Sequence, residues 1–157
     1  MSDPIHFATA RVSDIGAVMD VMEAAFDPAY GEAWSAAQLL TLFALPSARV
    51  CLAREGDRPC GFSAARVAGP ESELLLLAVN PLWRGRGVGR RLIDDWQAWA
   101  AREGAEDYFL EMRADNSAAR LYREAGFSEC GRRPAYYRGG DGVIRDAITM
   151  RRSANAS

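Results

Sequence analysis

Residues 74–89 read LLLLAVNPLWRGRGVG, and this stretch decides how the rest of the chain is interpreted. The apolar run within residues 73–79 predicts a strand that is buried on both faces. Asn80-Pro81 ends that strand, because proline has no N–H to donate to a neighbouring strand. A helix over about residues 88–103 comes next, and three glycines at alternate positions precede or open it, namely Gly85, Gly87 and Gly89.

Shorter periodic segments on either side of this stretch complete the element order β-α-α-β-β-β-α-β-α-β-β. The other predicted strands cover about residues 5–10, 50–54, 61–67, 108–113, 127–132 and 144–150. The other predicted helices begin after a cap at Ser13, at the capping-box pair Ser35 and Gln38, and at Ser117. This order predicts the α+β class, with a mixed, mostly antiparallel sheet of seven strands and about four helices.

Length and composition favour one domain over residues 1–152, followed by a disordered tail at 153–157 that has little to bury. The formal net charge of −2 gives no general attraction to nucleic acid. Three cysteines without CxxC spacing and a single histidine argue against a metal site and favour buried, reduced thiols. The chain starts without an export signal and has no membrane-length apolar run, so we expect a cytoplasmic protein with no membrane partner.

The glycine-rich loop has the chemistry of a phosphate-binding site. Glycine backbone N–H groups beside a helix start form a concave nest, and the arginines Arg84, Arg86, Arg90 and Arg91 add positive charge. A plain glycine-rich turn is the alternative interpretation. A P-loop is excluded, because Gly89 is followed by arginines and not by Lys-Ser or Lys-Thr. The dinucleotide motif is disfavoured, because its third glycine would come one residue later.

Two motifs in sequence order resemble the GCN5-related N-acetyltransferase superfamily. Arg84-x-x-Gly87-x-Gly89 after an apolar strand is similar to its motif A, and AARLYREAGF at 118–127 is similar to its fourth helix and following strand. The resemblance implies a splay between strands four and five and acetyl-CoA as co-substrate. It implies that the pantetheine arm pairs with the backbone of Leu77, Ala78 and Val79. The diphosphate would be held by Arg84 and by N–H groups of Gly85, Arg86, Gly87, Val88, Gly89 and Arg90.

Acetyl transfer to an amine needs a base and a proton donor for the leaving thiolate. Glu111 lies in an otherwise apolar strand, where it is either exposed or a partly buried base with a raised pKa. Tyr122 is either a core-boundary aromatic or, as the resemblance implies, the thiolate's proton donor. Asn116 either caps a turn or binds pantetheine or the acceptor. The spacing from Asn116 to Tyr122 is one residue shorter than is usual in the family.

Three further stretches resemble the ribosomal-protein-alanine N-acetyltransferase branch. They are EAWS at 32–35, LEMRADN at 110–116, and RRPAYY at 132–137 followed by DAITM at 146–150. The branch implies attack by the N-terminal alanine amine of a small-subunit ribosomal protein in a ternary complex. It also implies that Glu111 is the base and Tyr122 the acid.

Four aromatic residues in loops on the expected acceptor side either wall a peptide groove or anchor those loops: Tyr30, Trp34, Tyr136 and Tyr137. A small-molecule amine or a protein lysine is the alternative acceptor, and a non-catalytic CoA-binding sensor is the alternative function. We expect a monomer or weak dimer.

Overall fold

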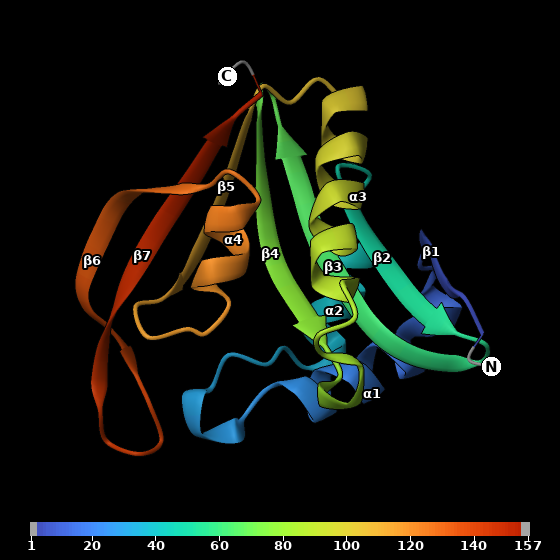
Figure 1. Cartoon of the computed structure of the whole chain (residues 1–157), viewed down its shortest axis with the longest axis horizontal. Helices are drawn as coiled ribbons and strands as arrows, with labels where there is room; N and C mark the ends of the chain where they lie inside the picture. Colours follow the sequence, from blue (N-terminus) through green and yellow to red (C-terminus); the bar gives the residue numbers. More distant parts are fainter. Residues whose placement is uncertain (1–2, 155–157) are drawn as a thin grey trace.

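The computed structural model describes residues 3–154 as one twisted sheet with helices on both faces (Figure 1). Its strands are β1 (Ile5–Thr9), β2 (Ala48–Glu55), β3 (Arg58–Ala68), β4 (Glu71–Val79), β5 (Asp107–Arg113), β6 (Ser128–Arg138) and β7 (Ile144–Ser153). Its α-helices are α1 (Ile15–Ala25), α2 (Ala36–Phe43), α3 (Val88–Arg102) and α4 (Ala119–Glu124). Short 3-10 turns are η1 (Val12–Asp14), η2 (Pro28–Tyr30) and η3 (Pro81–Trp83). The predicted α+β class, with seven strands and four helices, is confirmed.

The sheet has the order β1-β2-β3-β4-β5-β7-β6, and every neighbouring pair is antiparallel except β4 and β5. This parallel pair is short: it runs from Glu71 opposite Asp107 to Leu74 opposite Leu110. Beyond it, residues 75–79 of β4 have no partner on β5, and the two strands separate in Figure 1. The predicted splay is therefore confirmed, and it opens beside the start of α3.

Helices cover the two faces of the sheet in separate apolar layers. Helix α3 presents Ile93, Trp96 and Ala100 to a core built mainly with β5 and β7, which α4 joins through Tyr122. Helices α1 and α2 pack on the other face, against β2, β3 and β4. The Trp96 ring is fully buried, and its Nε1 donates a 2.9 Å hydrogen bond to the Ser72 hydroxyl. A buried indole needs such an acceptor, and the bond aligns α3 over β4.

Helix α1 begins later than the sequence predicts. Ser13 lies inside η1, and Asp14 precedes the first residue of α1. The Asp14 carboxylate accepts a 2.8 Å hydrogen bond from the Arg11 N–H, which closes the turn before the helix starts. The capping box at the second helix is confirmed, because Gln38 N–H donates to the Ser35 hydroxyl and Ser35 N–H to the Gln38 side chain.

Strand β6 is longer than predicted and includes Tyr136 and Tyr137, which were expected in a loop. Its register against β7 shifts between Arg133 and Tyr137, and Ala135 there has a φ of 52°. The Asp146 carboxylate accepts a 2.9 Å hydrogen bond from the Ala135 N–H and supports this bulge. A proline and two nearby glycines indicate a loop from sequence, whereas the bulge lets the strand continue.

Three smaller differences concern burial and the chain end. In the leucine run, Leu74 and Leu76 are buried, whereas Leu75 and Leu77 are only half-buried. Cys51 and Cys60 are buried as expected, but Cys130 is exposed on β6. Strand β7 extends through Ser153, and the Ala154 N–H donates 2.8 Å to the Glu106 carbonyl; the rest of the predicted tail, 155–157, lies outside the described residues.

Candidate active site

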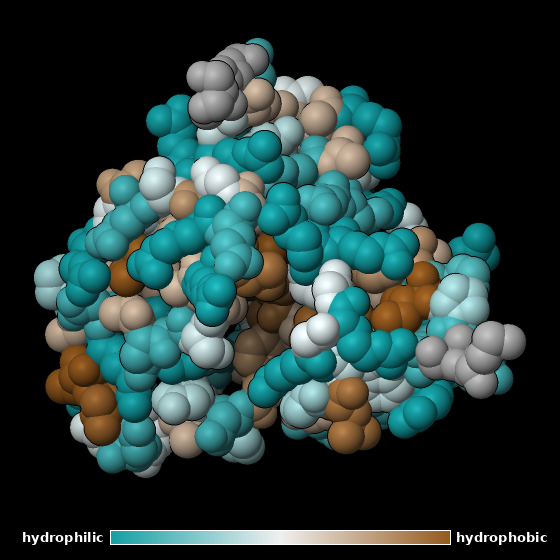
Figure 2. All heavy atoms as spheres, in the orientation of Figure 1, coloured by the Kyte–Doolittle hydropathy of each residue, from teal (hydrophilic) through white to brown (hydrophobic). Residues whose placement is uncertain are grey.

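Two adjoining cavities open where β4 and β5 separate. The larger has a volume of about 620 Å³ and is lined by the glycine-rich loop, the end of β4 and the start of α4. The smaller, about 290 Å³, is lined by β4, β5, the segment after α1 and β6. Figure 2 shows a hollow with a hydrophobic floor near the centre of this face. Five residues line both cavities: Phe26, Glu32, Leu77, Asn116 and Tyr122.

The glycine-rich loop meets the larger cavity at the N-terminus of α3. Gly85 and Gly87 both have a φ of 79°, a conformation that glycine adopts without strain, and Gly87 caps the helix. A Cβ on Gly89 would lie 3.0 Å from Leu121, so this glycine permits close packing of α3 against α4. Two glycines therefore shape the loop and the third brings the helices together. The first N–H groups of α3 have no partner within the helix and favour an anion.

The loop arginines differ in where they point. Arg84 and Arg90 line the larger cavity, whereas Arg86 does not. The Arg86 guanidinium instead pairs with Glu55 on β2, which also accepts a 3.3 Å hydrogen bond from Trp83 Nε1. The hydrogen bond from Arg86 lowers the pKa of Glu55, despite partial desolvation. Arg86 thus fastens the loop to the sheet.

The exposed edge of β4 offers backbone groups to the larger cavity. Asn80 N–H donates 2.8 Å to the carbonyl of Cys60, its partner across the antiparallel β3–β4 ladder. Hydrogen-bonded and non-bonded pairs alternate in such a ladder, and Val79 and Leu77 stand at the non-bonded positions opposite Gly61 and Ser63. Their N–H and C=O groups therefore point away from β3, into the splay. An extended ligand can pair with them as a missing strand would.

The smaller cavity gathers the residues predicted on the acceptor side except Tyr30, which lines the larger cavity. Glu111, Trp34, Tyr136 and Tyr137 line it, together with Tyr122. The two tyrosine rings on β6 are perpendicular, with centroids 5.2 Å apart. Burial, followed by the charges of Glu111 and Glu32, raises the pKa of Tyr137 to about 12. The Glu111 side chain is 22% exposed and so is partly buried, and its carboxylate pairs with Arg133 at 3.1 Å.

Tyr122 stands at the junction of the two cavities. Its residue is 7% exposed, and its ring packs edge-on against Phe127 at 6.2 Å. Burial, with a smaller contribution from the Glu32 charge, raises the pKa of Tyr122. Within residues 3–154, no group accepts a hydrogen bond from its hydroxyl. Tyr122 is thus both a core aromatic and a neutral hydroxyl that is available to a ligand.

Asn116 forms the predicted turn and also lies beside both cavities. Its Oδ1 accepts a 2.8 Å hydrogen bond from Ala118 N–H, which forms the turn before α4 and delays the helix start from Ser117 to Ala119. The same side chain borders both cavities. The amide nitrogen is therefore available at the place where the two cavities meet.

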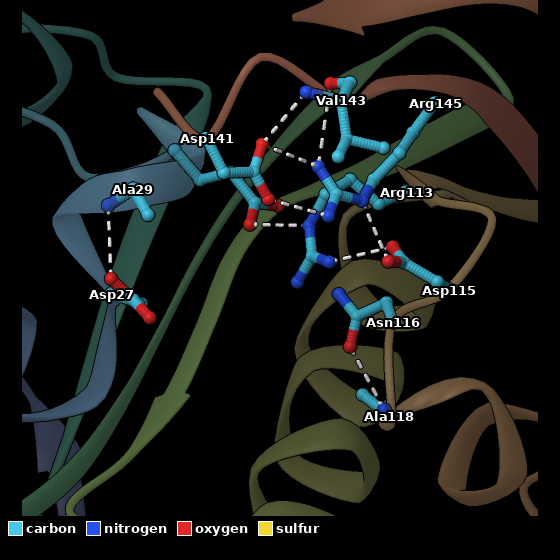
Figure 3. A network of polar contacts seen from close by, with 10 residues as sticks. Asp27, Ala29, Arg113, Asp115, Asn116, Ala118, Asp141, Val143 and Arg145 are labelled. Carbon is cyan, nitrogen blue, oxygen red and sulfur yellow. Dashed lines mark hydrogen bonds and ion pairs between the residues drawn. The ribbon is translucent and has the colours of Figure 1, made fainter. Parts of the chain in front are cut away.

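A network of arginines and carboxylates lies beside the larger cavity, which Glu32 and Arg113 line, and the sequence did not predict it (Figure 3). The Arg113 Nε donates 2.8 Å to Glu32, and its Nη1 donates 2.6 Å to Asp115. Arg145 donates 2.7 Å to the other oxygen of Asp115 and 2.9 Å to Asp141. We call these residues the Arg113–Arg145 network: Glu32, Arg113, Asp115, Asp141 and Arg145. It joins segments about 110 residues apart in the chain, which no local pattern reveals.

The two arginines of this network are largely buried, and they lower the pKa values of Asp115 and Asp141. Arg113 and Arg145 have side chains only 11% and 13% exposed. The hydrogen bond from Arg145 lowers the pKa of Asp141 to about 2. Burial alone would raise the pKa of Asp115, but Arg145 and Arg113 outweigh it and lower that pKa. Asp115 and Asp141 therefore stay ionised over the whole neutral range.

Comparison with known proteins identifies the family. A model described as the acetyltransferase (GNAT) family matches residues 18–127 of this chain. The chain belongs to the acetyltransferase (GNAT) family. The family predicted from the two motifs is confirmed, and with it the class of enzyme, an N-acetyltransferase.

Individual relatives narrow the branch. The N-alpha-acetyltransferase RimI of Mycobacterium tuberculosis is 36% identical over 126 residues, which cover 77% of this chain and 76% of that protein. A [ribosomal protein bS18]-alanine N-acetyltransferase of Haemophilus influenzae is 30% identical over 61% of this chain and 66% of its own length. The predicted resemblance to this RimI-like branch is therefore confirmed. An uncharacterised Mycobacterium leprae protein, 40% identical over 107 residues, is matched over only 28% of its length.

A solved structure supports the fold over nearly the whole chain. The ribosomal-protein-S18-alanine N-acetyltransferase of Escherichia coli superposes with a TM-score of 0.87 at 24% identity, covering 98% of this chain and 96% of that one. Among the residues that the structure describes, no helix is long and apolar enough to cross a membrane. The same residues, 3–154, contain no cluster of metal-binding side chains.

Proposed function

We propose that this acetyltransferase moves the acetyl group of acetyl-CoA onto the N-terminal alanine amine of a small-subunit ribosomal protein. The amine attacks the thioester directly, within a ternary complex. One observation carries the proposal: two cavities, one at the glycine-rich loop and one at Glu111, meet at Tyr122. A donor and an acceptor bound in them would be brought together at that junction, and such orientation can supply several kcal/mol of the barrier, on the order of 7 or more.

The larger cavity fits acetyl-CoA. The N–H groups of Gly85 to Arg90 and the charges of Arg84 and Arg90 would hold the diphosphate. The backbone of Leu77, Ala78 and Val79 would pair with the pantetheine arm along the open edge of β4. That places the thioester near the Val79 N–H, which would stabilise the developing oxyanion.

The smaller cavity fits an amine acceptor. Glu111 would take the proton of the ammonium group, directly or through water, and free the nitrogen lone pair for attack. The C–N bond then forms as the C–S bond breaks, and the Tyr122 hydroxyl would donate its proton to the leaving thiolate. The proton that the attacking nitrogen still carries would return to the tyrosinate, directly or through water, which leaves a neutral amide and a neutral tyrosine. The raised pKa of Tyr122 keeps that hydroxyl protonated at neutral pH. Trp34, Tyr136 and Tyr137 would contact the first residues of the acceptor.

The proton balance favours an α-amine over lysine. At pH 7 an α-amine of pKa about 7.8 is roughly 14% neutral, against about 0.04% for a lysine of pKa about 10.4. Deprotonating the α-amine therefore costs about 3.5 kcal/mol less free energy than deprotonating lysine, so a single carboxylate base suffices more readily. The relatives named as bS18-alanine acetyltransferases point to the same acceptor, and action on a ribosomal protein would place this enzyme in the cytoplasm.

The test uses three acceptors with one donor. A peptide with a free N-terminal alanine is compared with the same peptide N-blocked and carrying one internal lysine, and with a panel of small amines. Released CoA is quantified, and the acetylated position is found by mass spectrometry. The enzyme itself contains no lysine, so acetyl-lysine can arise only from the acceptor.

Turnover of the free alanyl peptide, at least about tenfold above the blocked one, is the expected result. Preference for the lysine peptide or for a small amine would overturn the proposed acceptor while keeping the acetyltransferase. The volume of the smaller cavity, about 290 Å³, makes a small amine the second candidate. Binding of acetyl-CoA without turnover of any amine would favour a sensor.

A further inference from the structure

Arg133 reaches Glu111 across the sheet because of the strand register. Glu111 on β5 stands opposite Thr149 on β7, and Thr149 stands opposite Gly131 on β6. Arg133 stands one row further along, opposite Ala147. Directly opposed residues share a face of the sheet, and so do alternate residues along one strand, such as Gly131 and Arg133. Arg133 and Glu111 therefore lie on the same face, two strands apart. Gly131 leaves the Glu111 row empty of a side chain on β6, which gives the arginine room.

The contact between the two side chains is an ion pair between groups of unequal exposure. Arg133 Nη2 lies 3.1 Å from Glu111 Oε2, with side-chain exposures of 60% and 22%. The guanidinium carbon also lies 4.8 Å from the centroid of the Tyr136 ring. Arg133 therefore comes from the solvent side and covers a partly buried carboxylate. Among the residues that the structure describes, it is the one ion-pair partner of Glu111.

Arg133 itself lines neither cavity, whereas Glu111 lines the smaller one. An arginine that holds one carboxylate oxygen restricts rotation of the whole group, and the second oxygen keeps its lone pairs for another partner. We propose that Arg133 is a positioning residue for the acceptor base: it holds Glu111 Oε2 so that Oε1 faces the acceptor. The inference rests on the proposed role of Glu111 and adds the residue that orients it.

The experiment is a double-mutant cycle with a matched control. Arg133→Gln and Arg133→Lys are made in the wild type, and Arg133→Gln also in a Glu111→Gln background. The control is Arg151→Gln, because Arg151 also pairs with a β5 carboxylate, Asp107 at 2.6 Å, and also faces a ring, Phe109 at 5.9 Å. Asp107 borders neither cavity. Values of kcat, and of KM for each substrate, are measured with every amine that the wild type acetylates.

The expected loss in Arg133→Gln is about tenfold in kcat, because a misdirected base is used less often. The KM for acetyl-CoA stays within about twofold, and Arg133→Lys recovers most of the rate, because one charged donor remains. In the Glu111→Gln background, Arg133→Gln changes kcat by less than about twofold. An equal loss in both backgrounds, or the same loss in Arg151→Gln, overturns the proposal.

A second measurement needs no turnover. With the glutamate side-chain carboxyls labelled with ¹³C, the Glu111 resonance should move in Arg133→Gln and stay in place in Arg151→Gln. An unmoved resonance in Arg133→Gln overturns the contact and the proposal with it. Failure of the alanyl peptide alone overturns only the proposed acceptor, because the cycle and the resonance do not depend on that peptide.

Discussion

The guanidinium carbon of Arg113 lies 3.7 Å from the centroid of the Tyr30 ring, so the end of β5 is stacked on the segment that follows α1. Arg145 approaches the same ring at 4.9 Å. Tyr30 is thus flanked by the two arginines of the Arg113–Arg145 network. The β6–β7 hairpin adds a backbone contact, because Gly140 N–H donates to the Ala29 carbonyl. Three segments from distant parts of the chain thus meet beside the larger cavity, which Tyr30 and Arg113 line.

Arg113→Gln should weaken the contact between these segments. The substitution leaves Glu32 and Asp115 without their shared partner, so we expect a loss of about 2 kcal/mol in unfolding free energy. Because Arg113 and Tyr30 line the larger cavity, the KM for acetyl-CoA should rise several-fold. Urea unfolding and steady-state kinetics measure the two effects. Arg120→Gln is the control. The Arg120 side chain is 88% exposed and forms an i,i+4 pair with Glu124, so its loss should cost under about 0.5 kcal/mol.

Glu111→Gln should lower kcat by about 100-fold at pH 7, because the acceptor ammonium loses its base. The deficit should shrink as pH rises past about 8, where the α-amine is already neutral. A pH series of kcat with the alanyl peptide tests both statements. Asp107→Asn, on the same strand and also paired with an arginine, should keep the wild-type rate. A constant deficit at every pH would contradict a role in proton removal.

Tyr122→Phe should separate catalysis from stability. Its hydroxyl has no acceptor among the described residues, so its removal should change the unfolding free energy by less than about 1 kcal/mol. The leaving thiolate loses its donor, and kcat should fall about 10- to 100-fold. Tyr108→Phe provides the comparison, because that buried hydroxyl lies 3.4 Å from the Gln97 carbonyl and outside both cavities. Equal effects of the two substitutions on kcat would rule out this role.

Gly87→Ala should weaken acetyl-CoA binding. At a φ of 79°, a Cβ costs about 1 kcal/mol in strain, and relaxation of the loop would misplace its N–H groups. Gly69 has a φ of 60° in the turn between β3 and β4, and a Cβ added there would meet open space, as it would at Gly87. Gly69→Ala should therefore lose similar stability and keep its affinity. Calorimetric titration with acetyl-CoA distinguishes the two variants, and equal affinities would contradict the assignment.

Tyr137 should make stability depend on alkaline pH. Its pKa is raised in the folded state to about 12, so its contribution is complete below the unfolded value of about 10 and is lost as pH rises toward 12. The chain has no lysine, so tyrosines and cysteines are the side chains that titrate in this range. Urea unfolding at pH 9 and pH 11 should show a smaller loss for Tyr137→Phe than for the wild type. Tyr136→Phe, whose residue is 51% exposed, should behave as the wild type does.

Much of the fold was predictable because its signals are local. Pro81 ends β4, Gly104 follows α3, and the Ser35–Gln38 pair caps α2, each through the backbone chemistry of one or two residues. The beginning of α1 was misplaced because Ser13 and Asp14 are both good caps, and only the Asp14 contact with Arg11 distinguishes them. Strand β6 was shortened because its bulge depends on Asp146 of the neighbouring strand.

The candidate site was predictable in its composition but not in its side-chain contacts. Every predicted site residue lines one of the two cavities except two of the loop arginines. Arg86 pairs with Glu55 from a strand 31 residues earlier, and the Arg91 guanidinium carbon lies 4.2 Å from the centroid of the Phe7 ring. Glu32 appears in the sequence only as part of a motif, yet it borders both cavities. The partners of Glu111 and Arg113 come from β6 and from the segment after α1. Such contacts are set by register and packing, which sequence spacing does not encode.

The departure of β5 from β4 leaves an alternating pattern of amide protection in the middle of the sheet. The N–H groups of Leu76 and Ala78 point to β3 and should exchange slowly with solvent deuterium in the free protein. Those of Leu77 and Val79 point into the opening and should exchange quickly. A ligand that completes the ladder would slow the second set and bridge the two halves of the sheet. Cofactor binding could then be measured, residue by residue, as the loss of the alternation between slow and fast amide exchange along β4.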